Sequence, residues 1–345
     1  MESRRVVVGL SGGVDSAVAA LRLLEQGYEV VGLLLDIPYA RSPLREAQQV
    51  ADALGIPLLH ADVAEAFARE VVGYFIDEYA AGRTPNPCVR CNPAVKFAAL
   101  TEAADRLGAA HIATGHYAGL RRQGDKTLLL RSGGPKDQSY MLHRLTQAQL
   151  ARLLLPLQGM DKTEVRALAA GAGLEVAGRP DSQELCFIPD NDRVAFLERH
   201  GPKLPPGDIV DPQGRPLGRH GGLWRHTVGQ RRGLGLSAEA RQFVTALSPA
   251  DNRVVLGPEQ DLYRRQITVG RLHLISGEPL TAPLRVTARV RYGRPETGAL
   301  LTPLGGDRAQ LDFDAPVRAP APGQSAVFYQ GEVVLGGGEI EAPVG

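Results

Sequence analysis

The first half of the chain alternates short apolar runs with amphipathic stretches. Residues 4–10 form a valine-rich run typical of a buried strand, whereas residues 16–26 carry apolar side chains at helical spacing. The pattern predicts further strands at 28–35, 56–61 and 111–114, a helix that ends at Gly55, and helices at about 64–80 and 94–107. Because strands separated by helices of this length form parallel sheets covered on both faces, we expect a doubly wound α/β sheet.

Two local signals follow this alternation. Residues 117–131 contain two alternating segments around Gln123-Gly124-Asp125, which predicts a β-hairpin on the α/β domain. Asp161 followed by Glu164 is a capping pattern and predicts a helix at 161–172.

The character of the sequence changes near residue 200. Residues 201–235 are rich in Gly, Pro and Arg, so only short strands are expected there. From about residue 267 strands and turns alternate to the end, the pattern of a small antiparallel β-barrel. We therefore expect three domains: an α/β domain at 1–200, a small central domain at 201–266 and a barrel at 267–345.

Composition narrows the class of protein without naming a partner. Hydrophobic residues make up 43% and charged residues 22% of the chain, as in soluble globular proteins, and the formal net charge is +1. Seven Lys/Arg between 199 and 232, and six between 121 and 144, suit a polyanion held at one face or an ordinary solvated surface. The sequence shows no secretory signal and no apolar stretch of membrane-spanning length. Its three cysteines favour a reducing compartment, so we expect a cytoplasmic protein.

A glycine loop lies between the first expected strand and the first expected helix. The loop reads SGGVDS, from Ser11 to Ser16. Glycines at such a turn let backbone N–H groups approach an anion, which predicts a phosphate cradle. It is neither a Walker A loop nor the GxGxxG fingerprint, because Asp15 stands where a lysine would. A carboxylate beside phosphates suggests an intervening Mg²⁺ ion, whereas the plain alternative is a tight turn with Asp15 or Ser16 as helix cap.

SGGVDS in this context resembles the PP-loop of the N-type ATP pyrophosphatases. The resemblance implies cleavage of ATP between the α- and β-phosphates and activation of a carbonyl or carboxyl oxygen by AMP. It does not identify the substrate, because synthetases of several kinds and RNA thiolases share the motif.

Five further motifs narrow the resemblance to the tRNA-specific 2-thiouridylases, which replace oxygen by sulfur at carbon 2 of the wobble uridine. In order, these are GRTPNPCVRCNPAVKF, ATGHYA, KDQSYML, DSQELCFIPD and HTVGQRRGLG. Two alternatives remain: a PP-loop thiolase for another tRNA base, and a tRNA-binding or iron–sulfur carrier protein with a vestigial ATP site. The C-terminal barrel and DSQELCFI argue against the first, and an intact SGGVDS argues against the second.

The resemblance implies a set of site residues. ATP would be bound by Gly9, Leu10, Ser11, Gly12, Gly13, Val14, Asp15, Ser16, Leu35 and Gly115. The target base would face Asn86, Pro87 and Cys88, and tRNA would also touch His116, Lys136, Asp137, Gln138, Arg291, Tyr292 and Gln324. The plain alternatives are a surface or capping role for His116 and an ordinary barrel strand for Arg291-Tyr292. Trp224 is expected to pack rather than to stack on a base.

The stretch TPNPCVRCNP, residues 84–93, holds two of the chain's three cysteines in what reads as a proline-stiffened loop. In one scheme Cys91 takes a persulfide from a donor protein, such as a cysteine desulfurase or a sulfur relay protein, and Cys186 then closes a disulfide. In the other, Cys88, Cys91 and Cys186 hold a 4Fe–4S cluster whose open iron delivers sulfide, and the cysteine inventory favours this scheme. A zinc site would need one more ligand, such as a histidine, and three merely buried cysteines are a weaker reading. The family usually has Asp at the position of Cys88, so this departure argues against an Asp-assisted mechanism.

Overall fold

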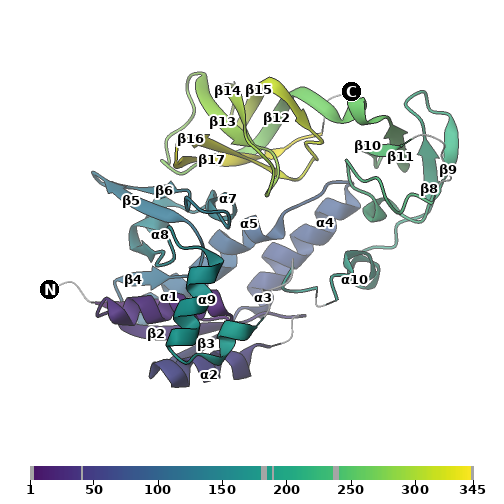
Figure 1. Cartoon of the computed structure of the whole chain (residues 1–345). Helices are drawn as coiled ribbons and strands as arrows, with labels where there is room; N and C mark the ends of the chain where they lie inside the picture. The colour runs from purple at the N-terminus through teal and green to yellow at the C-terminus, as the bar shows by residue number, and fades with distance from the viewer. Residues whose placement is uncertain (1–3, 40–41, 180–184, 189, 236–240, 343–345) are drawn as a thin grey trace.

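The computed structural model describes residues 4–39, 42–179, 185–188, 190–235 and 241–342. Its N-terminal part is built on a parallel sheet whose strand order is β3-β2-β1-β4-β7 (Figure 1). The five strands are β1 (Arg5–Gly9), β2 (Glu29–Asp36), β3 (Leu58–Asp62), β4 (His111–Ala113) and β7 (Leu153–Leu154). The predicted parallel sheet is therefore confirmed.

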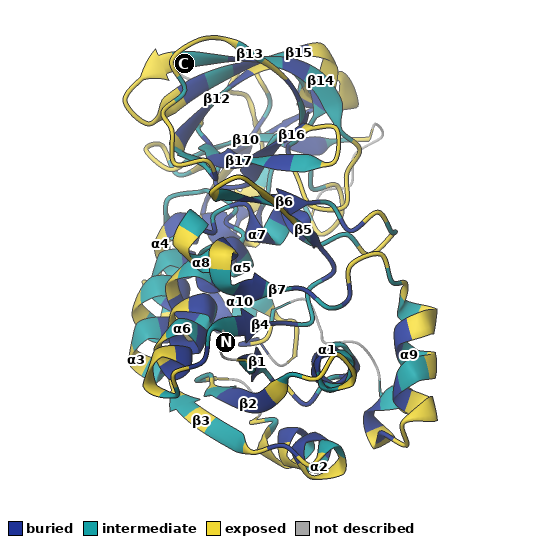
Figure 2. Cartoon of the chain, turned by 90° about the vertical axis from the view of Figure 1, so that its left-hand side faces the viewer, coloured by how far each residue is buried: buried dark blue, intermediate teal, exposed yellow. Residues whose placement is uncertain are grey.

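Helices cover both faces of this sheet because β1 is apolar on both sides. Val7 packs into a cluster with Phe97 and Leu100, whereas Val6 and Val8 pack into another with residues of α1, α2 and α9. β1 accordingly lies dark blue in the interior of Figure 2. The helices that flank the sheet are α1 (Val14–Glu25), α2 (Leu44–Leu54), α6 (Phe97–Arg106) and α9 (Lys162–Gly171).

The caps of two helices agree with their sequence signals. Gly55 closes α2 in the left-handed conformation (φ 66°). α9 begins with a reciprocal capping box, in which Asp161 accepts from the Glu164 N–H at 2.9 Å and Glu164 accepts from the Asp161 N–H at 2.7 Å. Shorter helices complete the fold: α7 (Ser139–Leu142), α8 (Gln147–Arg152), α10 (Arg193–His200), η3 (Glu175–Gly178), η4 (Leu223–Arg225) and η5 (Glu259–Leu262).

The cysteine segment is helical, so the expectation of a stiff loop was wrong. α5 (Pro87–Cys91) continues through a π-helical turn, η2 (Asn92–Lys96), into α6. Pro87 occupies the first turn of α5, where a missing N–H costs nothing, so proline starts the helix instead of preventing it. The region 64–80 is likewise divided into α3 (Ala64–Phe67), a π turn η1 (Ala68–Gly73) and α4 (Tyr74–Ala80).

The central part contains a small mixed sheet of short strands, in the order β10-β11-β8-β9. These are β8 (Gly207–Val210), β9 (Pro216–His220), β10 (Phe243–Ser248) and β11 (Arg253–Gly257). Trp224 is 3% exposed and packs with Phe75 and Phe187 in an apolar cluster, so it packs as expected.

The C-terminal part is the predicted antiparallel barrel, closed by pairing of β12 with both β15 and β17. Its six strands are β12 (Tyr263–Leu274), β13 (Leu284–Arg289), β14 (Thr297–Gly305), β15 (Arg308–Arg318), β16 (Ser325–Gln330) and β17 (Val333–Ile340). β12 begins before the boundary expected between residues 266 and 267. None of the helices in the described residues combines the length and apolar character that crossing a bilayer requires.

The predicted hairpin is present as β5 (Gly119–Gln123) and β6 (Lys126–Leu130), and it pairs with the sheet of the barrel, not with the parallel sheet. Leu130 and Leu129 of β6 pair with Val333 and Val334 of β17, which adds the hairpin to the barrel sheet. Leu129 is fully buried in the same cluster as Val327 and Val334. The apolar side of the hairpin therefore packs with barrel residues that are distant in sequence. A local sequence pattern does not reveal such a contact.

Candidate active site

The glycine loop forms an open cradle at the N-terminus of α1. Gly13 is the N-cap residue and provides no side-chain cap, so the first-turn N–H groups face an uncapped end. The Ser16 hydroxyl donates to the Gly13 carbonyl at 3.0 Å and accepts from the Ser11 N–H at 3.2 Å, which holds the loop in shape. Gly12 adopts φ 70° against α2, and a Cβ there would lie 2.6 Å from the Cβ of Glu46. The plain alternative, Asp15 or Ser16 as N-cap, does not hold.

Gly115 and Leu35 lie at the carboxyl ends of their strands, where open α/β sheets bind ligands. A Cβ on Gly115 would lie 2.6 Å from the backbone carbon of Asp15, so this glycine packs directly on the cradle. Leu35 is half-buried where two apolar clusters meet. The structure therefore brings together the segments predicted to bind ATP, although their contact with nucleotide stays a prediction.

Lys162 is a cradle residue that the sequence analysis missed. Its ammonium donates to both carboxylate oxygens of Asp15, at 2.7 and 2.9 Å, while the Tyr117 hydroxyl donates to the same carboxylate at 2.6 Å. Lys162 is the first residue of α9, directly after the cap Asp161. The capping box was the signal that could have identified Lys162. It fixes the residue at which α9 begins and therefore the position of the side chains in its first turn.

This geometry fits ATP, with the uncapped helix end for phosphates and Lys162 as a cation beside it. Mg²⁺ commonly binds through one or two carboxylates plus substrate phosphates, so Asp15 alone is a sufficient protein donor for an ion that arrives with the nucleotide.

The three cysteines are free and differ in exposure. Cys91 is 9% exposed and lies in the apolar cluster that also holds Phe187 and Ile188, the two residues that follow Cys186 in the sequence. Cys88 is half-buried and Cys186 is exposed. Burial raises the pKa of Cys91 to about 12 and also raises the pKa of Cys88. Cys186 is exposed as a residue, but the protein around its sulfur reduces solvation there and raises its pKa to about 11. All three are therefore thiols at neutral pH.

The 4Fe–4S assignment is not supported. Within the described ranges, which include all three cysteines, no group of three or more His, Cys, Asp or Glu side chains is arranged to hold a metal ion. The motif DSQELCFIPD can be assessed only in part, since residues 181–184 and 189 lie outside the described residues.

His116 and Asn86 lie near the cysteine helix. The His116 ring stacks on Phe97, with ring centroids 6.1 Å apart, and its Nδ1 is 2.7 Å from the Thr114 hydroxyl. Burial lowers the pKa of His116, so the ring is neutral. The Asn86 amide donates to the Met141 sulfur at 3.4 Å, and Pro87 is buried.

Two hydrogen bonds tie the barrel to the chain just before α5, the helix that contains Cys88 and Cys91. The Thr84 N–H donates to the Pro322 carbonyl at 2.7 Å, and the Gln324 amide donates to the Thr84 carbonyl at 2.6 Å. Gln324 is 8% exposed, so its amide is engaged inside the protein. Its contact with tRNA stays a prediction.

The other predicted tRNA residues form a surface of two loops. Arg291 and Tyr292 are exposed in the connection after β13, not in a barrel strand, and the Tyr292 ring lies 5.7 Å from that of Tyr140. Lys136 is exposed on the neighbouring loop. Asp137 and Gln138 instead hold that loop: Asp137 accepts from Ser132 and Ser139, and Gln138 exchanges hydrogen bonds with the Tyr117 backbone.

Three family models match consecutive parts of the chain. A tRNA methyl transferase HUP domain matches residues 4–190, a tRNA methyl transferase PRC-barrel domain 194–258, and an aminomethyltransferase beta-barrel domain 264–340. An NMN synthetase structure from Francisella tularensis, 17% identical over 52% of this chain and 67% of its own, has a TM-score of 0.35, too low to support an argument.

Full-length relatives are more informative. The tRNA-specific 2-thiouridylase of Caldanaerobacter subterraneus subsp. tengcongensis is 46% identical over 99% of both chains. That of Acetivibrio thermocellus is 42% identical over 99% of this chain and 100% of its own length, and that of Moorella thermoacetica is 45% identical over 97% and 99%. As its ordered motifs predicted, the chain belongs to the family of tRNA-specific 2-thiouridylases.

Proposed function

We propose that the protein carries out ATP-dependent 2-thiolation of the wobble uridine of tRNA. The observation that carries the proposal is the segment after β4, which joins the two halves of the site: Gly115 packs on the phosphate cradle, and His116 stacks on the helix that follows the cysteines. Neither alternative from the sequence, thiolation of another base or a carrier role, has an observation in its favour.

The first step activates the base. A uracil carbonyl is a poor electrophile, so its oxygen attacks the α-phosphate of ATP, pyrophosphate leaves, and the C2 oxygen becomes part of an AMP leaving group. The cradle and Lys162 hold the phosphates and stabilise the negative charge on the departing pyrophosphate. Asp15 would hold a Mg²⁺ ion together with the phosphates, and such an ion would supply further neutralisation of the phosphate charge. The base must be splayed from the anticodon loop into the protein to be reached.

The exposures of the thiols support an order of sulfur transfer opposite to the one expected from sequence. A persulfide carried by another protein reaches the exposed Cys186 more easily than the buried Cys91. The terminal sulfur of the Cys186 persulfide then attacks C2, the C2–O bond breaks, and AMP leaves with the oxygen. The Cys91 thiolate attacks the Cys186 sulfur, its own proton having gone to solvent. The bond to the transferred sulfur breaks, giving 2-thiouridine and a Cys91–Cys186 disulfide, which a thiol reductant returns to two thiols with two electrons.

Single turnover with unmodified tRNA, ATP and a persulfide-bearing donor protein tests the proposal. Nucleoside mass spectrometry should find 2-thiouridine at the wobble position, and omission of reductant should leave a protein two mass units lighter. Cys91→Ser and Cys186→Ser should abolish thiolation while tRNA still binds, and Asp15→Ala should stop pyrophosphate release.

Cys88→Ser is the matched control, because the persulfide scheme does not use Cys88. Loss of thiolation in this variant would favour a three-cysteine scheme instead. Sulfur at another base would contradict the proposed substrate.

A further inference from the structure

Lys96 ends the π turn that follows Cys91. The Phe97 N–H bonds to the Asn92 carbonyl five residues back, so the regular four-residue pattern of the α-helix is interrupted here. In a turn whose hydrogen bonds close over five residues, side chains five apart lie above one another. Lys96 and Cys91, five residues apart across this turn, therefore lie on roughly the same side of the helix, which a regular α-helix would not arrange.

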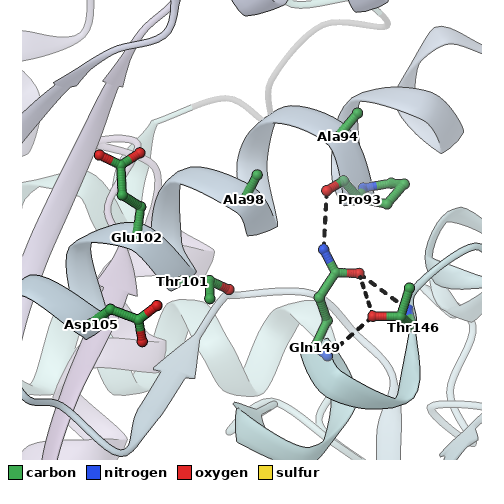
Figure 3. A pocket seen from close by; sticks show the side chains of 8 residues that line it. All are labelled: Pro93, Ala94, Ala98, Thr101, Glu102, Asp105, Thr146 and Gln149. Atoms are coloured by element: carbon green, nitrogen blue, oxygen red, sulfur yellow. Dashed lines mark hydrogen bonds between the residues drawn. The ribbon is translucent and has the colours of Figure 1, made fainter.

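Two side-chain hydrogen bonds hold the π turn in place. The Asn92 amide donates to the Met141 carbonyl at 2.9 Å, and the Gln149 amide of α8 donates to the Pro93 carbonyl at 3.0 Å (Figure 3). The groove in Figure 3, lined by Pro93, Ala94, Gln149 and their neighbours, includes neither Cys91 nor Lys96. These two residues thus lie on another side of a helix whose register is fixed.

Within the described part of the chain the Lys96 ammonium has no counterion. No residue in the described ranges forms a hydrogen bond or ion pair with it, although the side chain is half-buried. A half-buried cation is costly unless an anion joins it. By contrast, Arg90 on the same helical segment is paired with Glu70 at 2.9 Å.

The charge of Lys96 acts on three thiols and one neutral imidazole. Lys96 lowers the pKa of Cys88, of Cys91 and of Cys186, against the larger opposing effect of burial, and it lowers the pKa of His116. For Cys91, the neighbouring Cys88 and Cys186 act in the opposite direction.

We propose that Lys96 is the charge partner of the sulfur anion in this site, so that the anionic sulfur on Cys186 or Cys91 forms beside a cation that pairs with none of the described residues. The inference rests on the proposed function for its role in catalysis, but not for its test. Sulfur becomes a nucleophile only as an anion, and an apolar pocket opposes that charge. The empty place beside Lys96 is where the charge can be held.

The test measures thiol reactivity in the free protein, without tRNA or ATP. Iodoacetamide labelling is followed by peptide mass spectrometry at each cysteine from pH 7 to pH 10 in wild type, Lys96→Met, Lys96→Arg and the control Lys126→Met. Lys126 pairs with Glu278 on the exposed surface. We expect Lys96→Met to slow labelling of Cys186 and Cys91 about tenfold at pH 8, equivalent to a rise of one unit in pKa, and Lys96→Arg to restore most of the rate.

Unchanged rates in a Lys96→Met protein with an unchanged melting temperature would overturn the inference. A higher dissociation constant for tRNA or ATP, measured by binding alone, together with unchanged thiol reactivity would also overturn it, because Lys96 would then bind a phosphate. Should Lys96→Met fail to fold, the labelling rates of Lys96→Arg and Lys96→Gln are compared instead. Equal rates in these two variants would overturn the inference. Because no thiolation is measured, a wrong substrate assignment would leave this result standing.

Discussion

Gln324, in the C-terminal barrel, donates a hydrogen bond to the backbone carbonyl of Thr84, at the entrance to the cysteine helix. The barrel backbone completes the grip, because the Thr84 N–H donates to Pro322 and Gly323 lies so close that a Cβ would meet the Thr84 nitrogen at 2.9 Å. The barrel therefore positions the thiols, in addition to any contact that it makes with tRNA.

Gln324→Leu should lower kcat for thiolation by at least tenfold, because small misplacements of reacting groups cost much in rate. The dissociation constant for tRNA should stay within twofold, and hydrogen exchange at residues 84–91 should become faster. Gln330→Leu, an exposed barrel substitution, is the control. Weaker tRNA binding with unchanged kcat would mean that Gln324 acts on tRNA and not on the helix.

Gly323→Ala tests the same grip through the backbone. Gly323 has φ 86°, and the added methyl would press on both Thr84 and Arg83. We expect a loss of about 1–3 kcal/mol in the free energy of unfolding, measured in urea, from strain and displacement together. Gly331→Ala also sits at positive φ but meets nothing within 4 Å, so it should cost less. Equal losses in the two variants would show that the contact with Thr84 does not contribute to the free energy of unfolding.

Lys162→Met should reduce pyrophosphate formation on the order of 100-fold, the effect expected when a charged group aimed at developing charge is removed. Lys162→Arg should recover part of the rate, and tRNA binding should not change. Lys203→Met, on the exposed surface of the central part, provides the control. A Lys162→Met enzyme that releases pyrophosphate normally would limit this lysine to holding Asp15 in place.

The local parts of the fold could be predicted, and the long-range parts could not. Alternation of apolar runs identified the parallel sheet, and Asp161 with Glu164 identified the start of α9, because both are written in neighbouring residues. The contact of Lys162 with Asp15 joins residues 147 apart, and the pairing of β6 with β17 joins segments about 200 apart. Pro87 and Pro93 were misread because proline is compatible with a loop and also with the first turn of a helix.

His143 gives the fold a defined acid limit. It is fully buried, its Nδ1 lies 2.8 Å from the Tyr140 carbonyl, and burial lowers its pKa to about 3 from the ordinary 6.5. A depressed pKa in the folded state means that stability is complete above pH 6.5 and is lost as the pH falls toward 3, since the unfolded chain takes up the proton first. Between pH 7.5 and pH 4 the wild type should lose about 3 kcal/mol more than His143→Gln, measured by urea unfolding. His60→Gln, at an exposed position, should behave as wild type, and parallel curves for wild type and His143→Gln would show that this histidine does not set the acid limit.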